Sequence, residues 1–423
     1  MTPQKFLFIH QNFPGQFVHA AAELARLGHE VVALGIQGRA VPGVRLIRYA
    51  PKALARPSEL EAARDFETKI LRGTACAQAM QSLKQNGFTP DTVIAHPGWG
   101  EALFCKDVWP SARLLIFAEF FYSAEGADCN FDPEFASDSW HERARLRLKN
   151  SVHLHALHAA DAGYTPTQWQ LRQVPQVYHP KMSVIFDGID TALAAPDPQA
   201  KVKLQRDAIE LTENDEVITF VNRNLEPYRG FHVFIRALPE ILKRRPKAHC
   251  LIVGRDEVSY GTAPKTGGNW RQVMLAEVGA QLPMDRVHFL GQLAYKDYMR
   301  VIQISRCHVY LTYPFVLSWS CLEAMSAARV VVASNTGPVQ EVIEHGVNGL
   351  LVDFFDVAGL AQQVSEVLAE PAKYQNLGSR ARQTVLERYD LKAKCLPQQI
   401  NLICDKKVNE RVGHGPPLTI HLG

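Results

Sequence analysis

Several polar residues follow the places where buried strands are expected to end. They are two arginines, a short serine-containing turn and a glutamate. Arg223 follows the apolar run Val217 to Val221, and Arg229 precedes a glycine further along the chain. The sequence Ser318-Trp319-Ser320 opens an expected helix that carries Glu323 in its second turn. Backbone N–H groups in a first helical turn lack partners and carry the positive end of the helix dipole, so they hold anions, as guanidinium groups do. These residues predict a site for a phosphate-bearing ligand.

A second pair of polar side chains follows strands in the first half of the chain. His96 comes directly after the run Thr92 to Ala95, and Glu119 comes after Arg113 to Ala118. Ligands of open α/β sheets bind outside the carboxyl ends of the strands, so both side chains are expected to face a crevice. An imidazole and a carboxylate there can exchange protons with a substrate or bind its hydroxyl groups. A purely structural role is the alternative for each of them.

The elements that must position these residues alternate between strands and helices. From Tyr313 to Asp353 the apolar spacing changes twice between helix-like intervals and unbroken β-branched runs, which predicts a βαβα unit. At the amino terminus, a strand from Phe6 to Ile9 leads through a turn containing Gly15 into an amphipathic helix. This opening is Rossmann-like. It is not a Gly-x-Gly-x-x-Gly sequence, so a nicotinamide or flavin cofactor gains little support.

The chain is long enough for two domains. Its 423 residues exceed what one hydrophobic core usually supports. We predict the α/β fold class, with Rossmann-like domains in residues 1–190 and 201–389 and a linker rich in Ala, Pro and Asp in residues 191–200. Residues 390–405 are expected to form a helix that crosses back to the first domain, and residues 406–423 a disordered tail. The segment from Val258 to Asn269 is expected to be a mobile loop.

Composition argues against several other classes. The formal charge of +3 is too small to indicate a nucleic-acid-binding surface. The eight cysteines lack zinc-site spacing and lie mostly in apolar runs, which indicates reduced core residues in a cytoplasmic protein. No signal peptide fits before the first strand, and no apolar run reaches the roughly 18 residues that span a bilayer. A basic helix between Asp138 and His158 leaves peripheral contact with the inner membrane face as a minor alternative to a solvated face.

Six short motifs, taken in order, give the chain a family resemblance. They are Arg223-Asn-Leu-Glu-Pro-Tyr-Arg229-Gly230, Ile252-Val-Gly254, Phe289-Leu-Gly291, Leu322-Glu323-Ala324-Met325, Ser334-Asn-Thr-Gly337-Pro338-Val-Gln-Glu341 and Asn348-Gly349-Leu-Leu-Val-Asp353. Together they resemble the retaining, family-4 glycosyltransferases of the GT-B fold, from about Lys5 to Tyr389. Their order and spacing carry the resemblance, because no single motif is specific.

The resemblance implies two Rossmann-like domains facing one cleft, with a nucleotide-diphosphate sugar held mainly by the second domain. Arg223 and Arg229 would bind the diphosphate, with the backbone amides of Ser318 to Ser320 capping it. Glu323 would bind the nucleotide ribose. The contacts expected around the base and the remaining nucleotide come from Gly254, Phe289, Gly291 and Leu293.

The first domain would hold the acceptor. By the same resemblance His96 would touch the transferred sugar. Glu119 is a candidate acceptor-side group because of its place at a strand end. Gly15 would let a ligand approach the backbone closely. The acceptor itself is left open among a glycan, a lipid-linked sugar, a protein and a small molecule.

The resemblance also implies a reaction that needs neither a metal ion nor another cofactor. Breaking the anomeric C–O bond places negative charge on the departing diphosphate, and two guanidinium groups and a helix start can stabilise that charge. No Asp-x-Asp sequence stands at a strand end to hold Mg²⁺ instead. Without an obvious nucleophile, retention is explained by acceptor attack on the face from which the diphosphate leaves, with a phosphate oxygen taking the acceptor proton.

Two positions depart from the family pattern. Phe315 occupies the place of a second glutamate, eight positions before Glu323, that usually binds sugar hydroxyls. Arg229 replaces the usual lysine and lies one residue further from Arg223. Both changes leave diphosphate binding intact but leave the sugar undefined. The sequence also leaves the base and the oligomeric state open. Two rival functions are a GT-B-like nucleotide-sugar epimerase or phosphorylase and a catalytically weak partner subunit that binds a nucleotide sugar.

Overall fold

The computed structural model describes residues 2–52, 59–137, 139–204 and 209–405, and its contacts divide the chain into two compact units. Among the described residues, the first unit contains residues 2–52, 59–122, 139–186 and 396–405, and the second contains residues 123–137, 187–204 and 209–395. This division departs from the expected boundaries because residues 123–137, 187–200 and 390–395 all belong to the second unit. The expected tail, residues 406–423, lies outside the described residues.

The first unit is built on a parallel seven-stranded sheet with the order β5-β3-β1-β6-β7-β8-β9. The strand order reverses between β1 and β6, so the carboxyl ends of these two strands flank the switch point where open α/β sheets bind ligands. The strands are β1 Lys5–Ile9, β3 Glu30–Gly35, β5 Val44–Arg48, β6 Thr92–Ala95, β7 Arg113–Phe117, β8 Ala162–Thr165 and β9 Met182–Val184. Two further short strands, β2 Asn12–Phe13 after β1 and β4 Gln37–Gly38 after β3, pair with each other in parallel.

Helices cover both faces of this sheet, because successive strand side chains point to opposite faces. In β1, Phe6 and Phe8 join one core cluster, and Leu7 and Ile9 join the other. The Phe6 cluster is closed by α1 Val18–Arg26 and α14 Leu396–Cys404, and the Leu7 cluster by α2 Glu61–Gln85, α3 Cys105–Val108 and α5 Ser151–Ala159. The remaining helices are α4 Trp140–Lys149 and α6 Gln168–Gln173, with the short turns η1 Gly15–Phe17, η2 Pro97–Trp99 and η3 Gln176–Lys181.

The second unit repeats this plan with a parallel six-stranded sheet of order β14-β13-β12-β15-β16-β17. The order reverses between β12 and β15, which places this unit's switch point at their carboxyl ends. The strands are β12 Val217–Asn224, β13 His249–Arg255, β14 Val287–Gly291, β15 Cys307–Tyr310, β16 Val330–Ser334 and β17 Leu350–Val352. An antiparallel pair, β10 Lys201–Leu204 and β11 Ile209–Thr212, precedes them and was not predicted from the sequence.

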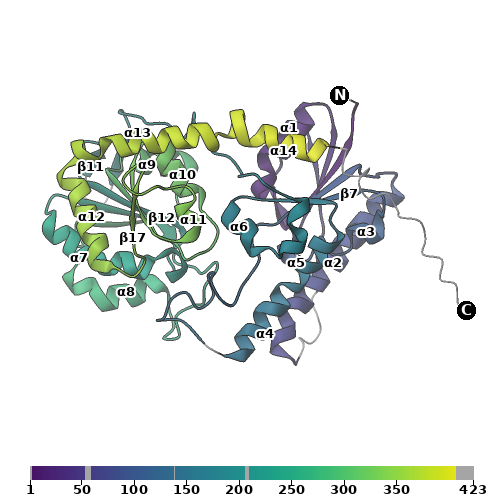
Figure 1. The fold of residues 1–423 in the computed structure, drawn as a ribbon, viewed down its shortest axis with the longest axis horizontal. Helices are drawn as coiled ribbons and strands as arrows, with labels where there is room; N and C mark the ends of the chain where they lie inside the picture. The colour runs from purple at the N-terminus through teal and green to yellow at the C-terminus, as the bar shows by residue number, and fades with distance from the viewer. Residues whose placement is uncertain (1, 53–58, 138, 205–208, 406–423) are drawn as a thin grey trace, which may run out of the picture. The chain divides into compact units, whose positions relative to one another are not determined.

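The helices of the second unit follow its strands in the expected alternation, and α7 packs beside α12 (Figure 1). They are α7 Phe231–Arg244, α8 Trp270–Val278, α9 Tyr295–Gln303, α10 Trp319–Ser326, α11 Gly337–Gln340, α12 Val357–Ala369 and α13 Pro371–Arg388. This unit also has two short 3₁₀ helices, η4 Pro227–Arg229 and η5 Gly279–Gln281, and one short π-helix, η6 Leu391–Cys395. Two parallel α/β units of this kind confirm the predicted fold class. Among the described helices, none combines the length and the apolar character that crossing a bilayer requires.

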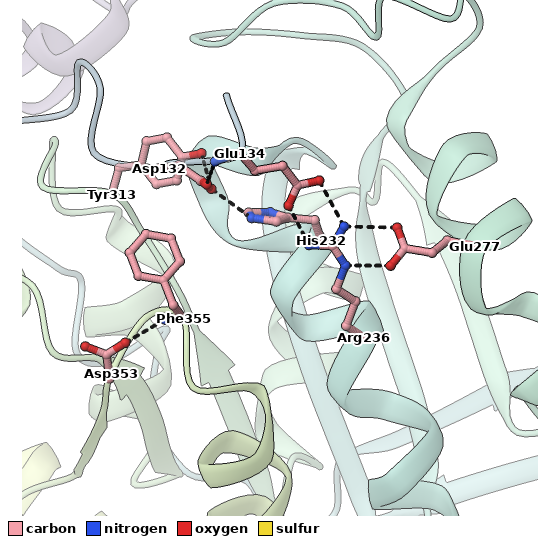
Figure 2. Close-up of polar contacts among 8 residues, drawn as sticks. All are labelled: Asp132, Glu134, His232, Arg236, Glu277, Tyr313, Asp353 and Phe355. Carbon is pink, nitrogen blue, oxygen red and sulfur yellow. Dashed lines mark hydrogen bonds and ion pairs between the residues drawn. The ribbon is translucent and has the colours of Figure 1, made fainter. Parts of the chain in front are cut away.

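Residues 123–137, here called the inserted segment, are anchored in the second unit by a buried polar contact (Figure 2). The Asp132 carboxylate lies 2.9 Å from Nε2 of His232 and accepts a 2.7 Å hydrogen bond from the Tyr313 hydroxyl. Burial alone would raise the pKa of Asp132, but the hydrogen bonds from His232 and Tyr313 lower it overall. The ring of Phe131 packs against Tyr313 as well. The segment therefore folds as part of the unit whose sequence lies after it.

A charged contact fixes the end of the inserted segment (Figure 2). Arg236 on α7 donates two hydrogen bonds to the Glu134 carboxylate, at 2.7 and 2.9 Å, and pairs with Glu277 on α8 at 2.6 Å. These hydrogen bonds lower the pKa of Glu134. Carboxylate and imidazole atoms of Asp132, Glu134 and His232 lie within 4.8 Å of one another, a spacing that could hold a metal ion. Because protein donors already satisfy both carboxylates, we do not assign a metal there.

Candidate functional site

The carboxyl ends of four adjacent strands bring the predicted second-unit residues to one edge of the sheet. Arg223 lies near the end of β12, Gly254 near the end of β13, and Gly291 at the end of β14. The loop after β15 leads into α10, which begins at Trp319. These strands flank the switch point between β12 and β15, so the residues lie where the topology predicts a ligand site.

Arg229 is a buried cation at this edge. Only 4% of its surface is exposed, and its Nη1 donates to Thr312 Oγ1 at 2.8 Å and to the Val316 carbonyl at 2.9 Å. Among the described residues no carboxylate lies within ion-pair distance of it. The turn that carries it depends on Gly230, whose φ is +66° and whose missing Cβ would lie 2.3 Å from the Cβ of Leu311. Arg223, by contrast, is exposed to solvent.

Aromatic rings surround the Arg229 guanidinium. Its carbon lies 5.2 Å from the ring centroid of Tyr260 and 5.7 Å from that of Phe315, within the range of cation–π attraction. Phe315 is buried and packs edge-on against Tyr260, with ring centroids 4.9 Å apart. The residue that departs from the family pattern is therefore part of the packing around Arg229.

The segment expected to be a mobile loop is held at its start by a buried carboxylate. Glu226 is fully buried, and its oxygens accept hydrogen bonds from the backbone amides of Ser259, Tyr260 and Gly261 at 3.0 to 3.3 Å. A carboxylate that accepts several amide hydrogens fixes the loop strongly. The position of the Tyr260 ring beside Arg229 follows from this contact.

The start of α10 has the form that the sequence predicts, with one difference. Ser318 is the N-cap residue in an extended conformation, but its side chain does not cap the helix. Its backbone amide instead donates to the Tyr310 hydroxyl at 2.8 Å, and the Trp319 indole donates to Asp187 at 2.8 Å. The Ser320 hydroxyl is buried without a hydrogen-bond partner among the described residues. After β16 the chain enters α11, a single turn of four residues.

Glu323 lies on α10 with its carboxylate between two tyrosines of α9. The Tyr295 hydroxyl donates to Oε1 at 2.9 Å, and the Tyr298 hydroxyl donates to Oε2 at 2.6 Å. Burial raises the pKa of Glu323, and the hydrogen bonds from Tyr298 and Tyr295 counter part of that rise. The side chain is thus a buried hydrogen-bond acceptor rather than a surface helix residue.

The residues predicted to line the base follow β14. Phe289 is partly buried, and the guanidinium of Arg271 on α8 lies 5.2 Å from its ring centroid. Gly291 adopts a left-handed φ of +65°, and Leu293 is partly buried in the turn before α9. The turn therefore joins the residues predicted to line the base directly to α9, whose tyrosines donate hydrogen bonds to Glu323.

The first unit brings His96 and Glu119 into direct contact. Nε2 of His96 lies 3.3 Å from Oε2 of Glu119, and the Gln16 amide donates to Oε1 of the same carboxylate at 2.8 Å. Nε2 of His10 lies 3.0 Å from the Gln16 carbonyl oxygen. Gly15 approaches His10 so closely that a Cβ there would lie 2.3 Å from its ring. These side chains follow β1, β6 and β7, whose carboxyl ends meet at one sheet edge.

The backbone fixes the tautomers of both imidazoles. The Gly98 amide donates to Nδ1 of His96, and the Asn12 amide donates to Nδ1 of His10, so each ring carries its proton on Nε2. Burial lowers the pKa of His10 to about 3. Burial alone would raise the pKa of Glu119, but the hydrogen bond from His96 lowers it overall. Glu119 is therefore an ionised acceptor, with about one third of its side chain exposed.

Sequence reasoning missed Gln16, Tyr295 and Tyr298. Gln16 stands 103 positions before Glu119, and no spacing rule connects residues that far apart. The two tyrosines did offer a weak signal, because residues three apart share one face of the helix that follows β14. Their partner Glu323 could not be predicted, because the contact depends on how α9 and α10 pack against each other.

Comparisons with known proteins cover both halves of the chain. A model of the glycosyl transferase family 4 group matches residues 27–194, and a model of the glycosyl transferases group 1 matches residues 201–384. The glycogen synthase of Mycobacterium tuberculosis is 25% identical over 393 residues, covering 88% of this chain and 86% of that protein. The D-inositol 3-phosphate glycosyltransferase of Thermobispora bispora is 24% identical over 52% of this chain and 51% of its own.

Solved structures share the fold over most of the chain. Anabaena HepE, in complex with UDP and glucose, has a TM-score of 0.65 at 19% identity, covering 94% of this chain and 98% of its own. The sucrose-phosphate synthase of Thermosynechococcus elongatus has a TM-score of 0.69 at 19% identity, with the same coverage. The family models and the shared fold together define a glycosyltransferase with the GT-B fold. The chain belongs to the family 4, group 1 glycosyl transferases, as its sequence motifs indicate.

Proposed function

We propose that this protein is a retaining glycosyltransferase that moves a sugar from a nucleotide-diphosphate sugar to an acceptor hydroxyl, without requiring a divalent metal. Arg223, Arg229 and the first turn of α10 would bind the diphosphate, and Glu323 would bind the ribose. His96 and Glu119 would recognise the sugar and the acceptor.

The single observation that carries this proposal is the state of Arg229. An arginine that is only 4% exposed needs an anionic partner, since burying an unpaired charge costs several kcal/mol. The described residues offer hydroxyl and carbonyl acceptors to Nη1 but no carboxylate. A diphosphate at the switch point would supply the missing charge and would explain why the arginine is kept there.

The start of α10 supports the same ligand through independent features. Its first backbone amides lie at the positive end of the helix, and Ser318 leaves its side chain out of the cap. The buried hydroxyl of Ser320, which has no hydrogen-bond partner in the described part of the chain, is a further donor at this place. The complex of HepE with UDP and glucose supports a nucleoside diphosphate as the group held by this fold.

The proposed chemistry depends on charge at the leaving group. As the anomeric C–O bond breaks, the electron pair stays on the departing phosphate oxygen, and Arg223, Arg229 and the helix amides stabilise it. The acceptor oxygen attacks the same face of the sugar, and its proton passes to the departing oxygen. Glu119 accepts a hydrogen bond from the acceptor and so orients it, because its charge is already fixed by Gln16 and His96.

A donor panel tests the proposal. Thermal shifts are measured with UDP-, GDP-, ADP- and TDP-sugars, since a ligand at a hundred times its dissociation constant adds about 2.7 kcal/mol to the stability. Release of nucleoside diphosphate is then followed with candidate acceptors in the presence of EDTA. We expect one donor class to stabilise the protein and to be cleaved in an acceptor-dependent reaction that EDTA leaves intact. Loss of activity in EDTA would overturn metal independence, and conversion of the donor without any acceptor would favour an epimerase.

A further inference from the structure

The Glu323 carboxylate is buried, yet the hydrogen bonds that it accepts come from neutral donors and not from a cation. It is 7% exposed, and both hydrogen bonds that it accepts come from the tyrosine hydroxyls of Tyr295 and Tyr298. Among the described residues no lysine, arginine or histidine lies within ion-pair distance of it. Buried carboxylates are usually balanced by a cation, so this arrangement calls for a different explanation.

The geometry leaves part of the carboxylate unused. Two carboxylate oxygens offer about four lone-pair positions, and each tyrosine hydroxyl occupies one. Two acceptor positions remain, one on each oxygen. A pair of adjacent hydroxyl groups is the ligand that matches two neighbouring acceptors without bringing a charge of its own.

The tyrosines lie between the two parts of the proposed nucleotide site. Both are on α9, which follows the turn after β14 where the base is expected. Their hydroxyls reach across to α10, whose first turn is expected to hold the diphosphate. Tyr298 is the more deeply placed ring, whereas Tyr295 is 47% exposed. A nucleotide whose base lies at that turn and whose diphosphate lies at α10 therefore has its ribose beside the Glu323 carboxylate.

We propose that Tyr298 and Tyr295 are positioning residues that fix the Glu323 carboxylate so that it accepts both hydroxyls of a ribose. The donor is then a ribonucleoside diphosphate sugar, and its 2′-deoxy counterpart is rejected. This inference rests on the proposed function, since it assumes that Glu323 faces the nucleotide. A carboxylate that is free to rotate would accept one hydroxyl as well as two, so the discrimination depends on the tyrosines.

The test compares matched nucleotide pairs by calorimetry. UDP, GDP and ADP are titrated beside their 2′-deoxy forms, and the base that binds most tightly is kept. Loss of a hydroxyl that donates to a charged acceptor should weaken wild-type binding about tenfold or more. We expect Tyr298→Phe to reduce this ribose preference about threefold to tenfold and Tyr295→Phe to reduce it less. The control is Tyr374→Phe, which removes another tyrosine-to-glutamate hydrogen bond in the same unit and should leave the preference unchanged.

The outcomes separate this inference from the function on which it rests. If wild type and Glu323→Gln both bind ribo and deoxy forms equally, Glu323 does not contact the ribose, and that part of the proposed function fails. If wild type prefers the ribose form and Glu323→Gln does not, but both tyrosine variants keep the full preference, only the positioning role is overturned. Should Tyr298→Phe fail to fold, the exposed position Tyr295 still gives the answer, since an unchanged preference in Tyr295→Phe would contradict the proposal.

Discussion

At the scale of single residues, hydrogen-bond donors lower the pKa of the Glu119 carboxylate. Glu119 receives hydrogen bonds from His96 and Gln16, whose own orientations are fixed by backbone amides and by His10. The carboxylate therefore stays ionised and keeps lone pairs for a further donor. An acceptor hydroxyl is the kind of group that can use them.

We expect Glu119→Gln to lower kcat about a hundredfold, because an acceptor hydroxyl that is misplaced by about 1 Å can cost that much. Affinity for the free nucleoside diphosphate should not change, since the groups proposed to hold it are in the second unit. Steady-state kinetics and calorimetry check the two parts. Glu23→Gln, which alters a surface glutamate paired with Arg26, is the matched control. Equal losses in kcat and in diphosphate affinity would argue against an acceptor-side role.

Residue positions at strand ends could be predicted from sequence, whereas their partners could not. Arg223, His96 and Glu323 each follow a strong strand pattern, and the switch-point rule then places them. Gln16 and Tyr298 gain their roles from contacts that form only after distant segments pack. The aromatic packing of Phe315 was hidden for the same reason, because its ring neighbours Tyr260 through a different loop.

At the scale of elements, the inserted segment is the clearest surprise. It contains no described helix or strand, and its anchors His232 and Tyr313 are about 100 and 181 positions away from Asp132 in sequence. Local pattern could not reveal such an attachment. The strands and helices themselves were predictable, because their apolar spacing is set by the face that each one buries. The segment adds Asp128 to the second unit, where it accepts a hydrogen bond from Tyr228.

Breaking the Asp132 contact should destabilise the second unit. Both Asp132 and His232 are at most 3% exposed, and removing one partner of a buried pair typically costs about 3 kcal/mol. We expect Asp132→Ala to lower a melting transition by roughly 6–12 °C, given the usual 2–4 °C per kcal/mol for a unit of this size. Differential scanning calorimetry measures it. Glu210→Ala, which breaks an exposed pair with Lys201, should shift it by far less. Similar shifts for both variants would mean that the contact contributes little.

At the scale of the whole molecule, two α/β units of the same plan are built from a chain that passes between them repeatedly. Contacts place the boundaries after residues 122, 137, 186 and 395. The sequence indicated a single linker after Asp190, because only that stretch changes composition. The other crossings carry no such mark. Length and alternating pattern fixed the number of units, but not which segments each unit includes.

Stability of the whole protein should fall on mild acidification. Burial lowers the pKa of His153 and His308 to about 3, from an ordinary value of 6.5. Their contribution is complete above about pH 6.5 and is lost as the pH falls toward 3, because the unfolded chain binds the protons first. Buried Glu101, whose pKa burial raises, acts in the opposite sense and loses its contribution as the pH rises.

A melting series between pH 7.5 and pH 4.5 measures this effect. The melting temperature should drop across the series, and the drop should be smaller in His308→Asn than in wild type. Exposed His141→Asn is the control and should follow wild type. A melting temperature that stays level or rises on acidification would contradict the assignment of neutral buried histidines.

The most direct test of the whole account is a calorimetric comparison of nucleoside diphosphate with nucleoside monophosphate binding, in wild type and in Arg229→Met. Arg244→Met, on the exposed face of α7, serves as the control. Hydrogen bonds to charged groups contribute about 1.5–3 kcal/mol each, so wild type should prefer the diphosphate at least tenfold. The account predicts that Arg229→Met loses this preference while Arg244→Met keeps it. Equal binding of the two nucleotides by wild type, or a full preference in Arg229→Met, would show that the buried guanidinium does not hold the diphosphate.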